Sequence, residues 1–308
     1  MIYKEALENN IFNHIGNCAD ELGLECYVIG GFVRDYIIKK TTPKDIDIVV
    51  VGNGIDFANS VSKKLKNTPK VTIFKTYGTA MFKYNDMEIE FVGARKESYN
   101  LESRNPKVSI GTLEDDQNRR DFTINSMAFS LNKSNYGALV DPFNGLSDIQ
   151  SKIIKTPLDP EITYNDDPLR MLRAIRFATN LDFKINKDSL KSIASLSSRI
   201  EIITKERIVV ELNKIMLTNK PSTGFILLEK CGLLKYILPE ITSLKGIDEI
   251  EGQTHKDNFY HTLEVLDNIC KHTDNLWLRW AALLHDIGKA TTKRFSKKVG
   301  WTFHGHEF

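Results

Sequence analysis

All the strand-like runs of this chain lie in its first half, and only helical periodicity follows them. Short stretches rich in Val, Ile and Phe and bounded by Gly, Asn or Pro are typical of strands. They occupy 27–31, 45–52, 70–74, 79–84, 88–94 and 138–143. Apolar residues at helical spacing fill 4–22 and 55–66. We therefore predict an α+β fold whose head domain, residues 1–150, is a small mixed β-sheet with helices.

Helical patterns continue to the end of the chain, which has 308 residues and room for two or three domains. Helices are predicted from about 169 and at 188–196, 204–217, 222–230, 257–272 and 276–288. A turn-rich stretch near Pro239 and Gly246 divides them. We expect a helical neck and body over 151–245 and a further helical domain over 250–308.

The composition excludes several classes of protein. Lys and Arg number 42 against 40 Asp and Glu, so a nucleic-acid site would have to be a local basic surface. No apolar run approaches the roughly 18 residues of a membrane span, and the N-terminal segment lacks the apolar core of a signal peptide. The four cysteines show no CxxC spacing and indicate a reducing compartment. We expect a cytoplasmic protein with no membrane partner.

Two carboxylates stand at alternate positions of a predicted strand, Asp45 and Asp47 in DIDIVV. Because strand side chains alternate, both emerge on one face, with Cα atoms roughly 6.5 Å apart. Such a pair can hold divalent cations about 3.5–4 Å apart, and its oxygen ligands suit Mg²⁺. A neighbouring strand should supply a third acid, for which Glu90 is a better candidate than Glu88. The alternative is a pair of solvated acids on an edge strand.

A glycine pair ends the first predicted strand in YVIGGFVRD. Gly30 and Gly31 leave backbone N–H groups that a phosphate can approach, and the following helix N-terminus adds a favourable dipole. Arg34 could bind that phosphate, or could pair with Asp35 or with another carboxylate of the head.

With these motifs in order, the sequence resembles the class II tRNA nucleotidyltransferases, the CCA-adding enzymes, and their relatives the bacterial poly(A) polymerases. The matching segments are GGFVRD with DID, RRDFTINSMAF (119–129), DPFNGLSDI (141–149), DDPLRMLRAIRF (166–177) and ERIVVEL (206–212). The resemblance covers about residues 24–240. It implies a template-independent enzyme that uses two Mg²⁺ to add CMP and AMP, from CTP and ATP, to the 3′ end of tRNA.

The resemblance also implies roles for individual residues. Arg120, Asp121 and Asn125 would contact the triphosphate and ribose. Asp167 and Arg170 would read the base, with Arg173 nearby. Cytosine and adenine both place an exocyclic amine beside a ring-nitrogen acceptor, so a carboxylate can accept from the one and a guanidinium can donate to the other. The alternative for the Asp167–Arg170 pair is an ordinary ion pair between residues three apart.

The polar segment 95–118 lacks periodicity, and we predict a long mobile loop there. In the family that the sequence resembles, enzymes that add only CC lack a flexible loop after the third carboxylate. The segment therefore favours complete CCA addition or addition of A alone. A poly(A) polymerase stays possible.

The last part of the chain resembles an HD-type phosphohydrolase domain that stops early, at Phe308. His261, His285, Asp286 and His304 are the candidate metal ligands. Imidazoles with one carboxylate suit Mn²⁺ or Ni²⁺. A metal-dependent phosphohydrolase is thus the alternative function from a different class, and a helical scaffold that helps to hold tRNA is the simpler interpretation.

Overall fold

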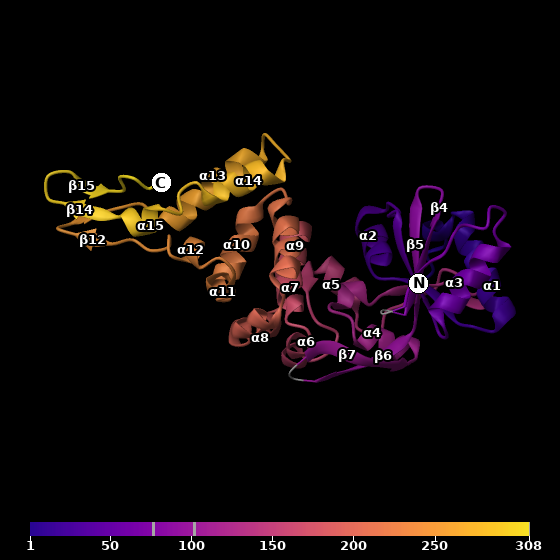
Figure 1. Cartoon of the computed structure of the whole chain (residues 1–308). Helices are drawn as coiled ribbons and strands as arrows, with labels where there is room; N and C mark the ends of the chain where they lie inside the picture. The colour runs from indigo at the N-terminus through magenta and orange to yellow at the C-terminus, as the bar shows by residue number, and fades with distance from the viewer. Residues whose placement is uncertain (76–77, 101–102, 308) are drawn as a thin grey trace. The chain divides into compact units, whose positions relative to one another are not determined.

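The computed structural model describes residues 1–75, 78–100 and 103–307, and it divides into two compact units, Met1–Asp159 and Pro160–Phe308 (Figure 1). The first unit contains a seven-stranded sheet with helices. The second is helical apart from short strands. The predicted α+β fold, with its sheet in the first half of the chain, is confirmed.

The first unit contains all six predicted strand segments. Its strands are β1 Cys26–Ile29, β2 Asp45–Val50, β3 Thr72–Phe74, β4 Thr79–Tyr84, β5 Met87–Gly93, β6 Arg95–Asn100, β7 Ser103–Ile110, β8 Ala128–Ser130, β9 Leu139–Val140 and β10 Ile153–Ile154. Its helices are α1 Asn10–Leu22, α2 Gly31–Lys39, α3 Gly54–Lys64, α4 Leu113–Asn118 and α5 Gly145–Gln150, with 3₁₀ turns η1 Lys4–Leu7, η2 Thr123–Asn125 and η3 Lys133–Asn135.

The large sheet has the strand order β3-β4-β5-β2-β1-β8-β9. Its neighbouring strands are antiparallel except for β2 and β5, which run parallel near the middle of the sheet. Parallel strands cannot be joined by a hairpin and need a crossover connection. Here the crossover is the segment 51–86, which contains α3, β3 and β4.

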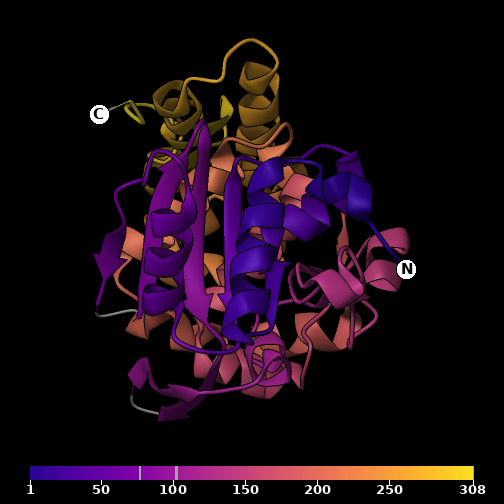
Figure 2. The ribbon, with the colours of Figure 1, turned by 90° about the vertical axis from the view of Figure 1, so that its right-hand side faces the viewer.

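The two faces of the central strands have different partners. One face packs against α1, α2 and α3 and forms the main core (Figure 2). Ile46 and Ile48 of β2 belong to this core and are 1% and 0% exposed, whereas Asp45 and Asp47 between and beside them are exposed on the opposite face. The predicted alternation along DIDIVV is confirmed, and it leaves the carboxylates on the face without the three helices.

The prediction of an irregular loop over 95–118 is wrong for the described part of that segment; residues 101 and 102 lie outside it. β6 and β7 pair antiparallel, and α4 follows. A reciprocal capping box starts α4, since Thr112 accepts from the Asp115 N–H and Asp115 accepts from the Thr112 N–H. The two strands belong to a separate sheet. Their sequence therefore need not alternate between apolar and polar residues, and periodicity could not reveal them.

The second unit has its helices close to the predicted places. They are α6 Pro160–Asp166, α7 Leu169–Leu181, α8 Lys187–Ser195, η4 Ser197–Ile202, α9 Lys205–Met216, α10 Pro221–Lys230, α11 Leu234–Ile237, α12 Pro239–Thr242, α13 Asn258–Cys270, α14 Leu276–Leu284 and α15 Lys289–Thr292. The short strands are β11 Lys184–Ile185, β12 Glu249–Ile250, β13 Gln253–Thr254, β14 Arg294–Ser296 and β15 Gly300–Thr302. The last predicted helix, 276–288, ends earlier, at Leu284. The turn that follows brings Gly288 against the His306 carbonyl, where a side chain would clash.

A buried arginine ties α14 to the end of α9. Arg279 is 1% exposed. Its guanidinium donates to the carbonyl oxygens of Met216 at 2.9 Å, Thr218 at 3.0 Å and Thr273 at 3.0 Å, and it pairs with the Asp274 carboxylate at 2.8 Å. These contacts supply donors for carbonyl groups that a helix end leaves unsatisfied.

Candidate functional site

Three acids meet on the face of the large sheet that lies opposite α1, α2 and α3. In the parallel pairing of β2 with β5, Asp47 lies opposite Glu90 and Asp45 lies opposite Glu88. The Glu88 carboxylate contacts Lys83 Nζ at 2.6 Å, near the ends of β4 and β5. Glu90, in contrast, stands beside Asp47 in the register of the strands. The structure therefore brings the predicted set Asp45, Asp47 and Glu90 together on two neighbouring strands.

The Asp47 carboxyl sits in a strongly negative environment. Its side chain reaches solvent, but protein groups crowd it and displace part of its hydration. This desolvation raises the pKa of Asp47 above its ordinary value. The Arg120 guanidinium opposes the rise, and the carboxylates of Glu90, Asp45 and Asp116 add to it. A bound cation would relieve this repulsion, so the oxygen-rich group fits a hard divalent metal ion such as Mg²⁺.

The glycine pair lies directly beside these acids. Gly30 has a positive φ of 80°, caps α2 and donates its N–H to the Met127 carbonyl at 3.2 Å. A Cβ atom at Gly30 would lie 2.9 Å from Arg120 Nη1 and 3.6 Å from Asp47 Oδ2. At Gly31 the nearest atom would be Arg34 Nη2, at 3.7 Å. The absence of a side chain at Gly30 therefore lets the Arg120 guanidinium approach the turn beside Asp47.

A chain of hydrogen bonds links the predicted nucleotide-binding residues of the head. Arg34 Nη1 donates to Asn125 Oδ1 at 2.7 Å, and Asn125 Nδ2 donates to Asp121 Oδ1 at 3.0 Å. Arg34 also pairs with Asp35 at 2.7 Å through its Nε. Asp121 and Asn125 are both buried. Of the alternatives for Arg34, the structure thus shows the pairing with Asp35 together with a contact to Asn125.

A buried acid next to this chain of hydrogen bonds was not among the predicted residues. Asp116 of α4 is 0% exposed and contacts the guanidiniums of both Arg119 and Arg120. Its neighbour Gln117 donates from Nε2 to the Ser126 carbonyl at 2.7 Å. The signal was the helical spacing in DDQNRR, where Arg119 and Arg120 follow Asp116 at three and four residues.

The predicted base-reading pair lies at the start of α7. Asp167 precedes the helix and accepts a hydrogen bond from the Leu169 N–H at 3.1 Å. Arg170 is 9% exposed, and its Nη1 donates to the Thr163 carbonyl of α6 at 3.3 Å. The two residues thus sit where α6 and α7 join, with Asp167 before α7 and Arg170 within its first turn.

The other arginines of α7 gather around one aromatic ring. The guanidiniums of Arg173 and Arg176 lie 5.6 and 3.9 Å from the centroid of Phe177. Arg176 Nε also contacts Glu211 Oε2 of α9 at 2.5 Å. Glu211 is buried, so an ion pair from the neck helix holds this side of α7. Glu211 was not among the predicted residues, although ERIVVEL contains it.

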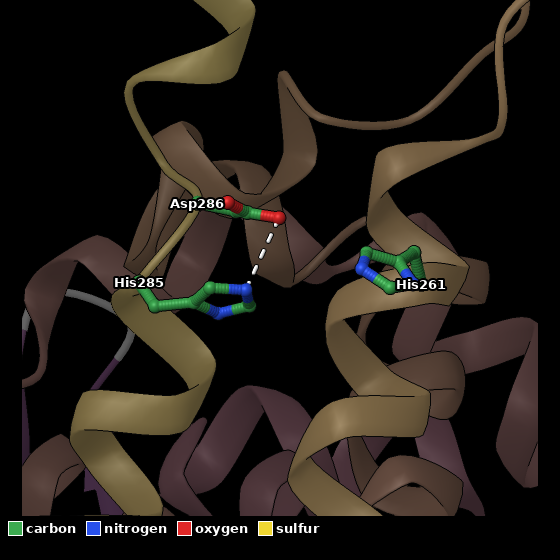
Figure 3. A group of neighbouring side chains, drawn as sticks. All are labelled: His261, His285 and Asp286. Atoms are coloured by element: carbon green, nitrogen blue, oxygen red, sulfur yellow. Dashed lines mark ion pairs between the residues drawn. The ribbon is translucent and has the colours of Figure 1, made fainter. Parts of the chain in front are cut away.

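A second group of possible metal ligands lies at the ends of α13 and α14. Figure 3 shows His285 and Asp286 facing His261. Ligand atoms of these three residues all lie within 4.8 Å of one another. His285 Nε2 is 3.1 Å from Asp286 Oδ2, and the other His285 nitrogen, Nδ1, is 2.8 Å from the Ala282 carbonyl.

Asp286 has two further partners, and the predicted ligand His304 is not one of them. Lys289 Nζ lies 2.6 Å from Asp286 Oδ2, and His306 Nε2 lies 3.5 Å from Asp286 Oδ1. The predicted fourth ligand, His304, is exposed and is not in the group that the structure forms. In the turn of HGHE the side chain that reaches Asp286 is His306, because the chain reverses at Gly305, whose φ is positive.

Three protein-family profiles match the chain in order. They are the Poly A polymerase head domain at residues 26–155, the probable RNA and SrmB-binding site of polymerase A at 182–245, and the HD domain at 258–308. In the described part of the chain, we find no helix with the length and apolarity that crossing a membrane would require.

The chain is also similar to proteins of known name. It is 34% identical over 294 residues to the Multifunctional CCA protein of Psychromonas ingrahamii, covering 92% of this chain and 67% of that protein. It is 41% identical over 168 residues to the A-adding tRNA nucleotidyltransferase of Aquifex aeolicus, covering 54% of this chain. The chain spans only 20% of the length of the Aquifex protein.

A solved structure shares the fold. A tRNA nucleotidyltransferase complexed with a primer tRNA and an incoming ATP analog has a TM-score of 0.69 and 28% identity, covering 88% of this chain and 75% of that one. The order of the three family segments, the shared fold and the extent of the sequence identity all indicate the same family. The chain therefore belongs to the family of class II tRNA nucleotidyltransferases and poly(A) polymerases, with a head, an RNA-binding region and an HD region.

Proposed function

We propose that this chain is a template-independent RNA nucleotidyltransferase that adds CMP and AMP to the 3′ end of tRNA and releases pyrophosphate. The observation that carries the proposal is the in-register placement of Asp47 beside Glu90, with Asp45 on the same face of β2. Acids gathered on an accessible sheet face destabilise one another, and such clusters are typical of functional sites. The similarity to CCA-adding and A-adding proteins supports the chemistry.

Asp45 and Asp47 are the residues that would hold two Mg²⁺, with Glu90 as the third acid. When bound, the two ions would lower the pKa of the RNA 3′-hydroxyl and stabilise the departing pyrophosphate. The raised pKa of Asp47, caused first by desolvation and also by Glu90 and Asp45, supports a cation in this place. The sheet itself contributes rigidity, because both aspartates lie on a strand that is paired on each side.

The nucleotide would lie against the glycine turn. The N-terminus of α2 at Gly30 and Gly31 offers backbone N–H groups to phosphate. The Arg120 guanidinium reaches the same turn. Arg34, Asn125 and Asp121 form one hydrogen-bonded chain, which fixes the Asn125 amide for the ribose.

The base would be selected by Asp167 and Arg170, with Arg173 beside them. The Asp167 carboxylate can accept from the exocyclic amine of C or A, and the Arg170 guanidinium can donate to the adjacent ring nitrogen. Uracil and guanine present a carbonyl beside an N–H and would be rejected. The contacts of Arg170 with Thr163 and of Arg176 with Glu211 support this role, because they hold the start and the side of α7.

Complete CCA addition is the activity that we favour. By the family resemblance, enzymes that add only CC lack a flexible loop after the third acid. This chain has the β6–β7 segment at that place. The named relatives include multifunctional CCA proteins and A-adding enzymes. A cytoplasmic location accords with four unpaired cysteines.

The test is a gel assay at single-nucleotide resolution. A labelled tRNA that lacks its CCA end is incubated with Mg²⁺ and CTP, ATP or both, beside a tRNA that ends in CC. Growth to the full CCA end only with both triphosphates supports the proposal. Extension of the CC-ended tRNA alone by one A indicates an A-adding enzyme, and a long ladder with ATP alone indicates a poly(A) polymerase. An active Asp45→Ala variant would contradict the metal assignment.

A second candidate activity rests on the group of His261, His285 and Asp286. Two imidazoles and a carboxylate suit Mn²⁺ or Ni²⁺ in a phosphohydrolase site. The contact of Lys289 with Asp286 weighs against tight binding, since an ammonium already occupies one carboxylate oxygen. Hydrolysis of a 2′,3′-cyclic phosphate that needs Ni²⁺ or Mn²⁺, is lost in His261→Ala and survives Asp45→Ala would establish it. No hydrolysis under these conditions would leave the HD region as scaffold.

A further inference from the structure

One carboxylate in the head is buried beyond the reach of solvent yet carries a full charge. Asp116 of α4 has a side chain that is 0% exposed. Burial raises the pKa of this carboxyl, but the guanidiniums of Arg120 and Arg119 outweigh that effect and hold the pKa below its ordinary value. A buried charge is costly to keep unless it is paired and hydrogen-bonded. Here two guanidiniums supply that pairing.

The two carboxylate oxygens of Asp116 have separate partners. Oδ1 accepts from Arg119, through Nε at 2.9 Å and Nη2 at 2.5 Å. Oδ2 accepts from Arg120 Nε at 3.1 Å, and Arg120 Nη2 lies 3.1 Å from the same oxygen as an ion pair. Two nitrogens of each guanidinium therefore lie against one carboxylate oxygen, which restricts the plane of the guanidinium as well as its distance.

The third nitrogen of Arg120 points away from Asp116. Nη1 lies 3.4 Å from the Asn125 carbonyl oxygen and faces the Gly30 turn, where a Cβ atom would be 2.9 Å away. The side chains of Arg119 and Arg120 keep 17% of their surface exposed, while Asp116 keeps none. Asp116 thus holds the Nε and Nη2 side of the Arg120 guanidinium, and the Nη1 side faces the Gly30 turn beside Asp47.

We propose that Asp116 is a positioning residue of the nucleotide site, which orients Arg120 for the triphosphate; this inference rests on the proposed function. A guanidinium that is already fixed loses little conformational entropy when phosphate binds. Arg119 binds the other oxygen of the same carboxylate, so both oxygens of Asp116 are occupied by arginines. A purely structural ion pair would need only one of them, and it would not have to point a nitrogen at the glycine turn.

The pairing explains why aspartate and not asparagine stands at this position. The D116N side chain would present one carbonyl oxygen and one NH₂ group, so one guanidinium would face a donor. Removing Arg119 at the same time would leave that oxygen to Arg120. Comparing D116N with the double variant that also lacks Arg119 therefore distinguishes a lost orientation of Arg120 from a loss of folding.

The experiment compares four variants of the full chain: D116N, R119Q, the double variant D116N/R119Q, and D115N as the matched control. Asp115 is the preceding residue of α4 and is occupied with the helix cap at Thr112. We expect D116N to raise the KM for ATP and CTP about tenfold while the KM for tRNA changes less than about twofold. R119Q and D115N should leave the nucleotide KM within about twofold, and the double variant should recover it to within about threefold.

Two results would overturn the inference. One is a D116N enzyme with the nucleotide KM of the wild type. The other is an equal rise in the KM for nucleotide and for tRNA without recovery in the double variant, which would show a structural role only. If D116N does not fold, the double variant decides alone: recovery within about threefold supports positioning, and a tenfold rise in a folded protein refutes it.

The wild-type chain in the same assay separates this inference from the proposed function. If it extends no RNA, the proposed function fails. The inference is then decided by calorimetric titration of ATP into the same proteins with Mg²⁺ present. A dissociation constant that is about tenfold weaker for D116N than for D115N supports it, and equal constants overturn it.

Discussion

Replacing the buried Arg279 by methionine should lower the free energy of unfolding of the second unit by about 2–4 kcal/mol. Methionine keeps most of the buried aliphatic stem but leaves the carbonyls of Met216 and Thr218 without the donor they have now. A buried polar group that loses its partner costs ~1–3 kcal/mol, and these two are affected. The Thr273 carbonyl also loses its donor but is only partly buried. Asp274 is 99% exposed, so its carboxylate returns to water at little cost. Water can reach the end of α9 and replace part of the lost hydrogen bonding, so we expect the total cost for the two carbonyls in the lower part of its range.

Urea denaturation followed by tryptophan fluorescence measures this change directly. The chain has three tryptophans, Trp277, Trp280 and Trp301, and all of them lie in the second unit, so the signal reports on that unit. Arg294→Met is the matched control, since Arg294 is exposed and donates to the neighbouring carbonyls of Thr291 and Lys293. It should change the free energy by less than about 0.5 kcal/mol. The reasoning is refuted if Arg279→Met changes the free energy of unfolding as little as Arg294→Met does.

Three further predictions concern the proposed nucleotide site. Asp47→Asn should abolish incorporation yet stabilise the first unit at neutral pH without divalent cations. The folded state raises the pKa of Asp47 above 3.8, so the stability of the wild type falls as the pH rises from 3.8 through the pKa of the folded state. Melting curves by circular dichroism should therefore show that the stability gained by the variant vanishes below pH 3.8. Gly30→Ala should lower the free energy of unfolding by ~1–2 kcal/mol because of the positive φ, and should raise the nucleotide KM by displacing Arg120. Gly31→Ala is the milder control, and equal effects of the two substitutions in urea denaturation and kinetics would contradict this prediction. Arg170→Ala should weaken discrimination against UTP and GTP in single-nucleotide incorporation, and an unchanged ratio would remove Arg170 from base reading.

The fold was predictable where burial imposes a period on the sequence. Ile46 and Ile48 alternate with Asp45 and Asp47 because one face of β2 packs on helices, and that alternation can be seen without a structure. The β6–β7 pair lies in a separate sheet with no such pattern along its residues, so periodicity predicts a loop where the structure has strands. The Thr112–Asp115 capping box was also missed, although its spacing is visible in the sequence.

The site residues were predictable as motifs but their partners were not. Asp116 and Glu211 are acids within helices, and only the fold shows that both are buried against arginines. The choice between His304 and His306 depends on which way a turn with Gly305 faces, and spacing alone cannot decide that. Long-range contacts of charged side chains therefore account for most of what the sequence could not reveal.

The parallel pairing of β2 with β5 also determines when the acid cluster can exist. Asp47 and Glu90 belong to strands that are separated by the whole crossover segment 51–86, and they become neighbours only through that pairing. Closing such a loop costs chain entropy before any contact compensates for it, which makes parallel pairing slow to form. A head that has merely collapsed, with its local helices in place, has no assembled set of acids. If the proposed function holds, nascent or partly unfolded copies of the protein would be unable to modify RNA ends, and activity would report directly on completed sheet formation.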